Sequence, residues 1–355
     1  MVSVAAVAGL IIPFAHKLGV RTADMGNASD WNQVAGPFSG AVQANFGDVA
    51  RELGAARSGA FVSPLAHFDL LRFSGADAFS FLQGQFTCDL QQITPTRAQY
   101  GGYCSPQGRL LASFLLMLTP QGYLMLLPAE LSESTAARLK KFILRSQVSI
   151  GHEQGVRAIG LGGPGAAAVL GKLIGQPPGR PLEMVLYPSA TLLRLPGDAF
   201  VALVASAEIE AVWNSIASLA VPAGSGAWDW LQVRSGIPWI TAPTQDQFIP
   251  QMAGLDAIGG VSFDKGCYPG QEIVARTHYL GEVKRQLRAG HVDDVAQAGD
   301  RLFAHGQSRA VVVNAATSPD GGSDLLAVAQ VAADGEVLHL RADPGAQVRL
   351  SAIPA

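Results

Sequence analysis

Residues 265–272 read Lys-Gly-Cys-Tyr-Pro-Gly-Gln-Glu, and this stretch decides how the rest of the chain is interpreted. Gly266, Pro269 and Gly270 favour a tight turn, because glycine adopts backbone angles closed to other residues and proline fixes its own. The turn holds a cation, a thiol, a phenol and a Gln-Glu pair. Such a mixture on a loop is typical of a functional site.

Cys267 lies two residues after Lys265. A nearby ammonium lowers the pKa of a thiol, so the sequence predicts Cys267 as the reactive group and Lys265 as its activator. Tyr268, Gln271 and Glu272 complete the predicted site, since the amide and the carboxylate offer acceptors for the NH groups of a ring ligand. The alternative is a tight turn around a buried structural cysteine.

Composition bounds the class of protein. The chain has 355 residues, 48% of them apolar, which is long enough for two or three hydrophobic cores. The net charge of −3 lacks the basic footprint of a dedicated nucleic-acid binder. Cys88, Cys104 and Cys267 are widely spaced and odd in number, which argues against a disulfide framework or a CxxC metal site and predicts a cytoplasmic protein. A metal or cluster site built from these three cysteines is a minor alternative.

The N-terminus begins with an apolar run over residues 2–14, which is shorter than the ~20 residues that span a bilayer. The first cation is Lys17, so the run lacks the basic segment of a secretory signal. We interpret residues 1–55 as an N-terminal extension, loosely structured to about Ala50. A signal peptide is the less favoured interpretation, and no membrane association is expected.

Hydrophobic periodicity and turn signals organise the next part of the chain. A helix is predicted over 74–83, with Ser74 as its cap and Gly84 as its stop. Strands over 98–104, 110–118 and 123–127 predict an antiparallel meander. A helix over 132–144 follows, with its apolar stripe formed by Leu131, Thr135, Leu139 and Phe142.

A second part is predicted over 151–225 as a ferredoxin-like layer, since strands and helices alternate there as in a split βαβ unit. The last part, 281–355, has turn signals at short intervals and predicts a small β-barrel. The expected strands of the second part cover 156–161, 184–187, 191–195 and 200–205, its helices cover 166–174 and 207–219, and the barrel strands cover 309–313, 326–331 and 336–340.

Residues 160–165 match the dinucleotide-binding pattern G-x-G-x-x-G after an apolar strand. That fingerprint needs backbone NH groups facing a pyrophosphate and a parallel strand ending in an acid. Pro164 removes one NH, and the strand after it is predicted to continue into a hairpin. We therefore interpret the run as a glycine-rich turn, and a nucleotide-dependent oxidoreductase is the least favoured function.

The region around residues 265–272 resembles the signature of the YgfZ family, folate-binding proteins related to the glycine-cleavage T-protein (aminomethyltransferase). FIPQ precedes the signature at 248–251, and ARTHYLGEVKRQL follows it at 275–287. Further blocks are similar to those of the family, and the resemblance runs from about Phe61 to the C-terminus. These blocks are GAD at 75–77, FLQGQ at 81–85 with Thr87 and Asp89, Cys104 with GRL at 108–110, and Trp230-Leu231 with GIP at 236–238.

This resemblance implies an α+β fold of three domains in a ring around a tetrahydrofolate pocket. Residues 56–150 with 226–280 would form the discontinuous folate-binding domain, 151–225 the ferredoxin-like domain and 281–355 the barrel. It also implies an accessory role in assembly or repair of iron–sulfur enzymes, including radical enzymes that modify tRNA. The implied partners are a folate derivative and iron–sulfur enzymes or assembly proteins.

A transferase of the T-protein type is the alternative function. The resemblance implies an acidic residue after a glycine in the second block, but residues 108–113 read Gly-Arg-Leu-Leu-Ala-Ser. Without a carboxylate, the general acid–base role has no occupant. The sequence therefore favours folate binding without aminomethyl or methyl transfer.

Two aromatic positions and one basic stretch extend the predicted folate site. Phe68 stands where family members carry a tryptophan, and Trp230 keeps a second aromatic position; each offers a face to a pterin, or is ordinary core. Arg276, followed by Lys284, Arg285 and Arg288, suits the glutamate tail of folate or a phosphate backbone. Its alternative is a solvated strand face.

Overall fold

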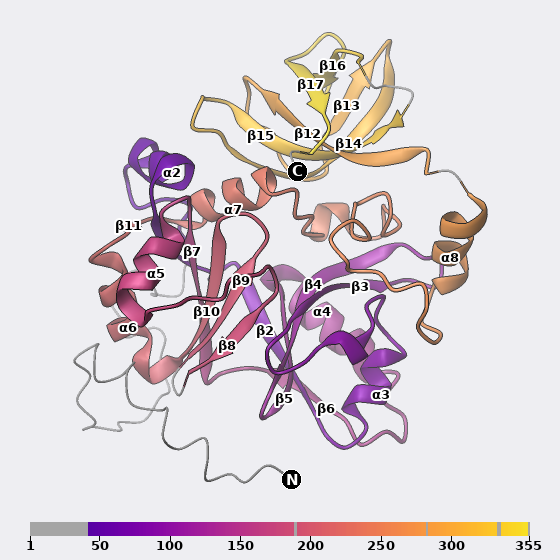
Figure 1. Cartoon of the computed structure of the whole chain (residues 1–355). Coiled ribbons are helices and arrows are strands. Elements are labelled where there is room, and N and C mark those ends of the chain that lie inside the picture. The colour runs from indigo at the N-terminus through magenta and orange to yellow at the C-terminus, as the bar shows by residue number, and fades with distance from the viewer. Residues whose placement is uncertain (1–41, 188–189, 282, 332–334, 354–355) are drawn as a thin grey trace, which may run out of the picture. The chain divides into compact units, whose positions relative to one another are not determined.

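The computed structural model describes residues 42–187, 190–281, 283–331 and 335–353. The chain divides into two compact units (Figure 1). Unit 1 comprises residues 1–66 and 154–231, and unit 2 comprises 67–153 and 232–355. The predicted signal-peptide region and most of the predicted extension lie outside the described residues.

Unit 1 is built on a six-stranded sheet in the order β11-β1-β7-β10-β9-β8. β1 pairs parallel with β11, and the other neighbours pair antiparallel. Two helices, α5 and α6, bury Leu170, Trp213 and Ile216 with the sheet in one apolar cluster. The elements are β1 (Phe61–Pro64), β7 (Val156–Gly162), α5 (Ala166–Ile174), β8 (Met184–Leu186), β9 (Ala190–Leu195), β10 (Ala199–Ala205), a 3-10 turn (Ser206–Glu208), α6 (Ile209–Ala217) and β11 (Val221–Pro222). The strands and helices predicted for this part are present, and the end strands β1 and β11 are additions.

A helix, α2 (Val49–Ser58), begins inside the segment predicted as an extension. The Asp48 side chain caps it by accepting from the NH of Arg51. Buried Glu52 accepts from the NH groups of Phe46 and Gly224, at 2.7 and 2.9 Å. A buried carboxylate is tolerated only when hydrogen-bonded in this way, so this end of the segment is an ordered part of unit 1.

The glycine-rich run 160–165 joins β7 to α5, and its neighbours contradict a dinucleotide site. Both strands beside β7 are antiparallel to it, whereas the nucleotide-binding unit needs parallel neighbours. The NH groups of Gly163 and Gly165 donate to the carbonyls of Asp198 and Gly59, at 2.9 and 2.7 Å. A side chain on Gly163 would meet the Gly59 carbonyl at 2.6 Å, so the glycines serve packing.

Unit 2 contains a five-stranded antiparallel sheet in the order β3-β4-β5-β2-β6, which includes the predicted meander. The predicted start of the first helix is wrong: Ser74 is paired as the last residue of β2, Gly75 has a non-helical φ of +115°, and α3 begins at Ala78. The next helix ends at Lys140 rather than Leu144, which leaves Phe142 51% exposed instead of buried. The elements are β2 (Phe68–Ser74), α3 (Ala78–Gln83), a 3-10 turn (Leu90–Gln92), β3 (Gln99–Cys104), β4 (Leu110–Thr119), β5 (Gly122–Pro128), α4 (Ala129–Lys140) and β6 (Ser149–His152).

The rest of unit 2 ends in a closed barrel in the order β12-β15-β14-β13-β16-β17, as predicted. Asn314 on β14 links the barrel to the preceding segment, since its side chain accepts from the Trp239 NH and donates to the Trp239 carbonyl at 2.9 and 2.8 Å. The elements are α7 (Ser225–Arg234, entering from unit 1), a 3-10 turn (Ala242–Thr244), α8 (Gln271–Leu280), β12 (Arg285–Val292), β13 (Arg301–Ala304), β14 (Gln307–Thr317), β15 (Ser323–Gln330), β16 (Leu338–Leu340) and β17 (Gln347–Ser351).

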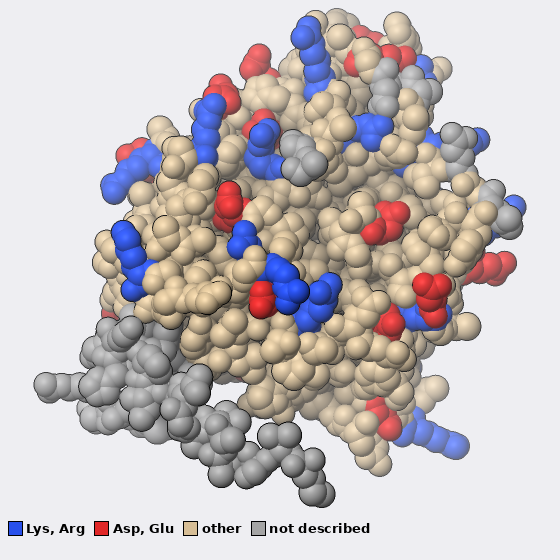
Figure 2. Space-filling model, viewed as in Figure 1, with Lys and Arg blue, Asp and Glu red and all other residues tan. Residues whose placement is uncertain are grey.

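The distribution of charged side chains on the surface agrees with the small net charge of the chain. Figure 2 shows Lys and Arg scattered among Asp and Glu on the face in view, with both signs on the barrel at its top. Among the described residues, no helix combines the length and the apolar character needed to cross a membrane.

His152 on β6 joins three elements of unit 2. Its Nδ1 lies 2.6 Å from Asp69 Oδ2 on β2, and its Nε2 lies 3.0 Å from Glu133 Oε2 on α4. Burial works against the charge on the imidazole, but the two carboxylates outweigh it and raise the pKa of His152 above its usual value. The protonated imidazole therefore holds β2, β6 and α4 together.

We expect His152→Gln to lower the unfolding temperature more in acid than in alkali. A folded-state pKa raised above the unfolded value of about 6.5 gives stability that is complete below that pH and lost as the pH rises through the raised value. Thermal unfolding across this range, with exposed His305→Gln as the control, measures the difference. A gap between wild type and His152→Gln that does not narrow as pH rises would refute the role of the imidazolium.

Candidate ligand-binding site

The loop before α8 is held in place by two glycines that approach each other. Gly270 has φ +79° and Gly108, in the turn between β3 and β4, has φ +72°. A side chain on Gly270 would lie 2.5 Å from the Gly108 Cα and 2.5 Å from the Ser105 carbonyl oxygen. Glycine is required at 270 both for its left-handed backbone and for this contact, which docks the loop against the sheet.

Thr87 fixes the start of the same loop. Its hydroxyl donates to the Gly260 carbonyl at 2.6 Å and accepts from the Gly102 NH at 2.8 Å, while its own carbonyl accepts from the Ser262 NH at 2.8 Å. The block around Thr87 and the loop are thus bonded directly, although they are far apart in sequence.

Lys265 carries the strongest of these links. It is only 8% exposed, and its Nζ donates to the carbonyls of Gln83, Phe86 and Cys88 at 2.5, 2.6 and 3.0 Å. Burial lowers the pKa of Lys265 to about 8, opposed by the nearby Cys88 and Asp89. Because all three ammonium protons are donated to carbonyls, the structure supports an anchoring role for Lys265 rather than the predicted activation of Cys267.

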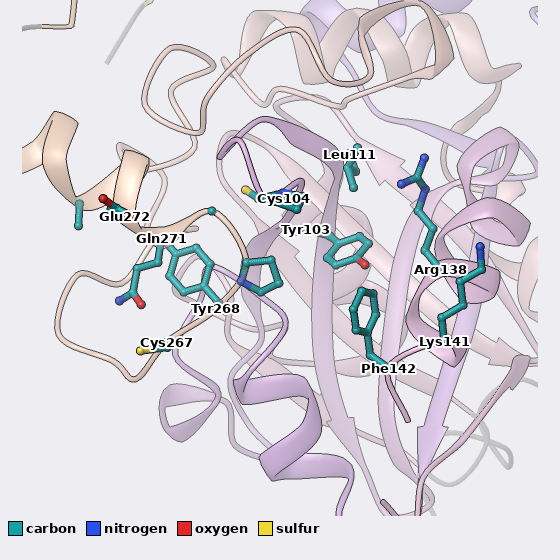
Figure 3. Close-up of a pocket in the computed structure, with 14 residues that line it drawn as sticks. Tyr103, Cys104, Leu111, Arg138, Lys141, Phe142, Cys267, Tyr268, Gln271 and Glu272 are labelled. Carbon is teal, nitrogen blue, oxygen red and sulfur yellow. The ribbon is translucent and has the colours of Figure 1, made fainter. Parts of the chain in front are cut away.

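A cavity of about 910 Å³ in unit 2 opens beside this loop (Figure 3). One side is the loop itself with the start of α8, and the other is the end of α4 with strands β3 and β4. The lining residues are Tyr103, Cys104, Pro106, Leu111, Arg138, Lys141, Phe142, Cys267, Tyr268, Pro269, Gly270, Gln271, Glu272 and Ala275.

Tyr268 contributes a largely buried side chain to the wall of the cavity. The side chain is 6% exposed, and its hydroxyl has no hydrogen-bond partner among the described residues. The ring packs beside Lys265, with Nζ 5.3 Å from its centroid. Burial, and then the nearby Cys104, raise the pKa of Tyr268, so the phenol stays protonated and can donate one hydrogen bond.

The three cysteines differ in access. Cys88 and Cys104 are buried, and burial raises the pKa of both thiols, to about 12 for Cys88. Cys267 is exposed, so it is not a buried structural cysteine. Of the two thiols that line the cavity, Cys267 is the one that a partner in solution can reach.

Some of the residues predicted to bind folate line the cavity, and the others do not. The cavity brings Gln271 and Glu272 together with Tyr268 and Cys267, and the Gln271 amide makes one long contact with the Lys265 carbonyl at 3.4 Å.

The others do not line the cavity. Phe68 packs edge-on against Trp239, with centroids 4.7 Å apart, Arg276 is exposed on α8, and Trp230 is buried in α7 within unit 1. Their roles in binding stay predictions.

Sequence reasoning missed the opposite side of the cavity. Arg138 lies in the last turn of α4, and Lys141 and Phe142 directly follow the helix. In the sequence all three fall in a predicted helix that reads only as an amphipathic scaffold. The early end of α4 is the local signal for Phe142, but nothing in the sequence connects this helix to residues 267–275.

Similarity to known proteins shows the family to which this chain belongs. Residues 15–179 match the model described as the GCVT N-terminal domain. The chain is 34% identical over 295 residues to "tRNA-modifying protein YgfZ" of Edwardsiella ictaluri, a match covering 80% of this chain and 89% of that protein. The protein of the same name from Colwellia psychrerythraea is 32% identical over 294 residues, covering 77% and 90%. The chain belongs to the YgfZ family.

The fold expected for a YgfZ family member is also confirmed by a solved structure. Glycine cleavage system aminomethyltransferase T from Bartonella henselae matches with a TM-score of 0.73 at 18% identity, covering 86% of this chain and 89% of that one. The α+β class with a closed C-terminal barrel is therefore shared with the T-protein fold. The three-domain division proposed for this YgfZ chain stays a prediction.

We expect Lys265→Met to lower the free energy of unfolding by about 2–4 kcal/mol, because it leaves three buried carbonyls without donors. Lys140→Met, at an exposed position on α4, should stay within about 0.5 kcal/mol of wild type. Urea unfolding followed by circular dichroism measures both. Equal stability of the two variants would contradict the anchoring role.

Proposed function

We propose that this protein is a cytoplasmic, tetrahydrofolate-binding accessory factor for assembly or repair of iron–sulfur enzymes, including enzymes that modify tRNA. The observation that carries the proposal is the cavity that joins the loop 265–272 to a wall of aromatic side chains. Membership of a family whose named relatives are tRNA-modifying proteins supports the second half of the proposal.

The cavity suits a flat heterocycle with polar edges. Tyr103, Phe142 and Tyr268 offer aromatic surface to a pterin or an aminobenzoyl ring. The side chains of Gln271 and Glu272 supply acceptors for ring NH groups. Bound tetrahydrofolate would supply its ring nitrogens, which carry one-carbon groups.

Cys267 has a separate task in this proposal. Thiolates are the usual ligands of iron–sulfur clusters, and an exposed thiol can also exchange with a partner's cysteine. Because Cys267 is exposed beside the cavity, it is placed to meet a client enzyme while the cavity holds folate.

The cavity favours binding over transfer chemistry. Proton transfer to a folate nitrogen needs a positioned acid or base, and strand β4 presents Leu111 to the cavity. Glu272 is the one carboxylate among the lining residues, and it belongs to α8. We therefore do not advance the aminomethyltransferase alternative.

Folate binding is tested by anaerobic calorimetric titration with tetrahydrofolate. We expect saturable binding that Phe142→Ala weakens roughly tenfold by removing an aromatic contact. Leu144→Ala is the matched control, since Leu144 is 89% exposed and does not line the cavity. If Phe142→Ala binds tetrahydrofolate with the affinity of wild type, the folate site lies outside this cavity. If wild type does not bind tetrahydrofolate, the folate proposal is overturned.

The thiol is tested with Cys267→Ser in cells lacking the native protein. We expect serine, which is nearly isosteric, to keep tetrahydrofolate affinity within about twofold while failing to restore iron–sulfur enzyme activities, since a hydroxyl does not replace a thiolate ligand. Cys88→Ser, at a buried site, is the comparison, with its folding checked by circular dichroism. Full restoration by Cys267→Ser would make Cys267 dispensable.

A further inference from the structure

The end of the cavity at α4 is positively charged. Arg138 and Lys141 both line the cavity there, and both are exposed. Among the described residues, neither side chain forms an ion pair or a hydrogen bond, whereas the acids of the same helix are occupied. Glu133 accepts from His152 at 3.0 Å and Glu130 from the Ala242 NH at 2.8 Å. The two positive charges are therefore available to a ligand that binds in the cavity.

Arg138 acts on the cavity wall itself. Burial raises the pKa of Tyr103, and the positive charge of Arg138 works against that rise. The two side chains therefore interact electrostatically, and both line the cavity.

The cationic end lies apart from the loop that carries Cys267. Figure 3 shows Arg138 and Lys141 on one side of the cavity and Cys267, Gln271 and Glu272 on the other, with Tyr103, Phe142 and Tyr268 between them. A ligand that uses the whole cavity must be elongated, with polar ring edges near the loop, flat aromatic parts in the middle and an anion near α4.

Folate has this order of groups, because its pterin and aminobenzoyl rings are followed by a glutamate or a chain of γ-linked glutamates. We propose that Arg138 and Lys141 form a subsite for the carboxylates of the glutamate tail. The inference rests on the proposed function and deepens it, since it makes polyglutamylated folate the preferred ligand. Arginine pairs with carboxylates in a bidentate manner, and lysine adds a point charge that follows a flexible chain.

The subsite differs from the basic stretch predicted from the sequence, which begins with Arg276 on α8 and continues with Lys284, Arg285 and Arg288. Arg276 is exposed but does not line the cavity, whereas Arg138 and Lys141 do.

The test compares tetrahydrofolate with one and with five glutamates, by anaerobic calorimetry at low salt. We expect wild type to bind the pentaglutamate about tenfold more tightly, since each exposed charge pair contributes about 0.2–1 kcal/mol. In Arg138→Gln/Lys141→Gln the difference should fall below about twofold. Added salt should reduce the wild-type difference in the same direction.

Lys140→Gln/Arg145→Gln is the matched control, because it removes the same charge from exposed positions that do not line the cavity. It should keep the wild-type preference, as should Arg276→Gln. Equal binding of both folates by wild type would overturn the subsite while leaving the proposed function intact. The subsite is also overturned if the cavity variant keeps the preference, or if tripolyphosphate displaces the pentaglutamate at comparable concentration. No binding of either folate would overturn the proposed function, and the subsite with it.

Discussion

The buried ammonium of Lys265 is the interaction on which the candidate site depends. Removing a charge from water is costly, and here the cost is offset by three carbonyl oxygens, those of Gln83, Phe86 and Cys88. Those carbonyls lie at the end of α3 and just after it, so one side chain fixes the loop to a segment more than 170 positions earlier in the chain. The neighbouring Cys267 and Tyr268 receive their positions from this anchor, one exposed and one buried.

The sequence predicted the strands better than the ends of the helices. Runs of strand-forming residues between Gly and Pro turns predicted the meander strands β3, β4 and β5 and the barrel strands β14, β15 and β16, but not β12, β13 and β17. Helix ends depend on which backbone groups find partners: Asp77 reads as a first-turn acid but bonds to Gln147 NH, and α4 stops before Phe142. The helix α8 was not predicted: its N-cap is Gly270, and no side chain caps its first turn.

The site itself was half predictable. Residues 267–272 are unusual as a group in the sequence, and the structure brings Cys267, Gln271 and Glu272 to one cavity. The partners of Lys265 could not be predicted from the sequence. Proximity in sequence suggested Cys267, whereas in the fold Lys265 donates to three backbone carbonyls. The place of Arg138 and Lys141 in the site could not be predicted either, because only the packing of α4 against the sheet brings them to the cavity.

The two sides of the cavity impose different conditions on an occupant. At the loop, Gln271 and Glu272 offer hydrogen-bond acceptors, which favours a ring that carries NH groups over a purely apolar one. At α4, two cations without acidic partners favour an anion but place little constraint on its shape. A small molecule that contacts only the loop, or only the two cations at the end of α4, would lose the interactions at the other side of the cavity. Selectivity for a ligand therefore depends on the distance between these two sides. That distance is set by the packing of α4 on one side and by the Lys265 anchor on the other, which ties ligand choice to the same contact that stabilises the loop.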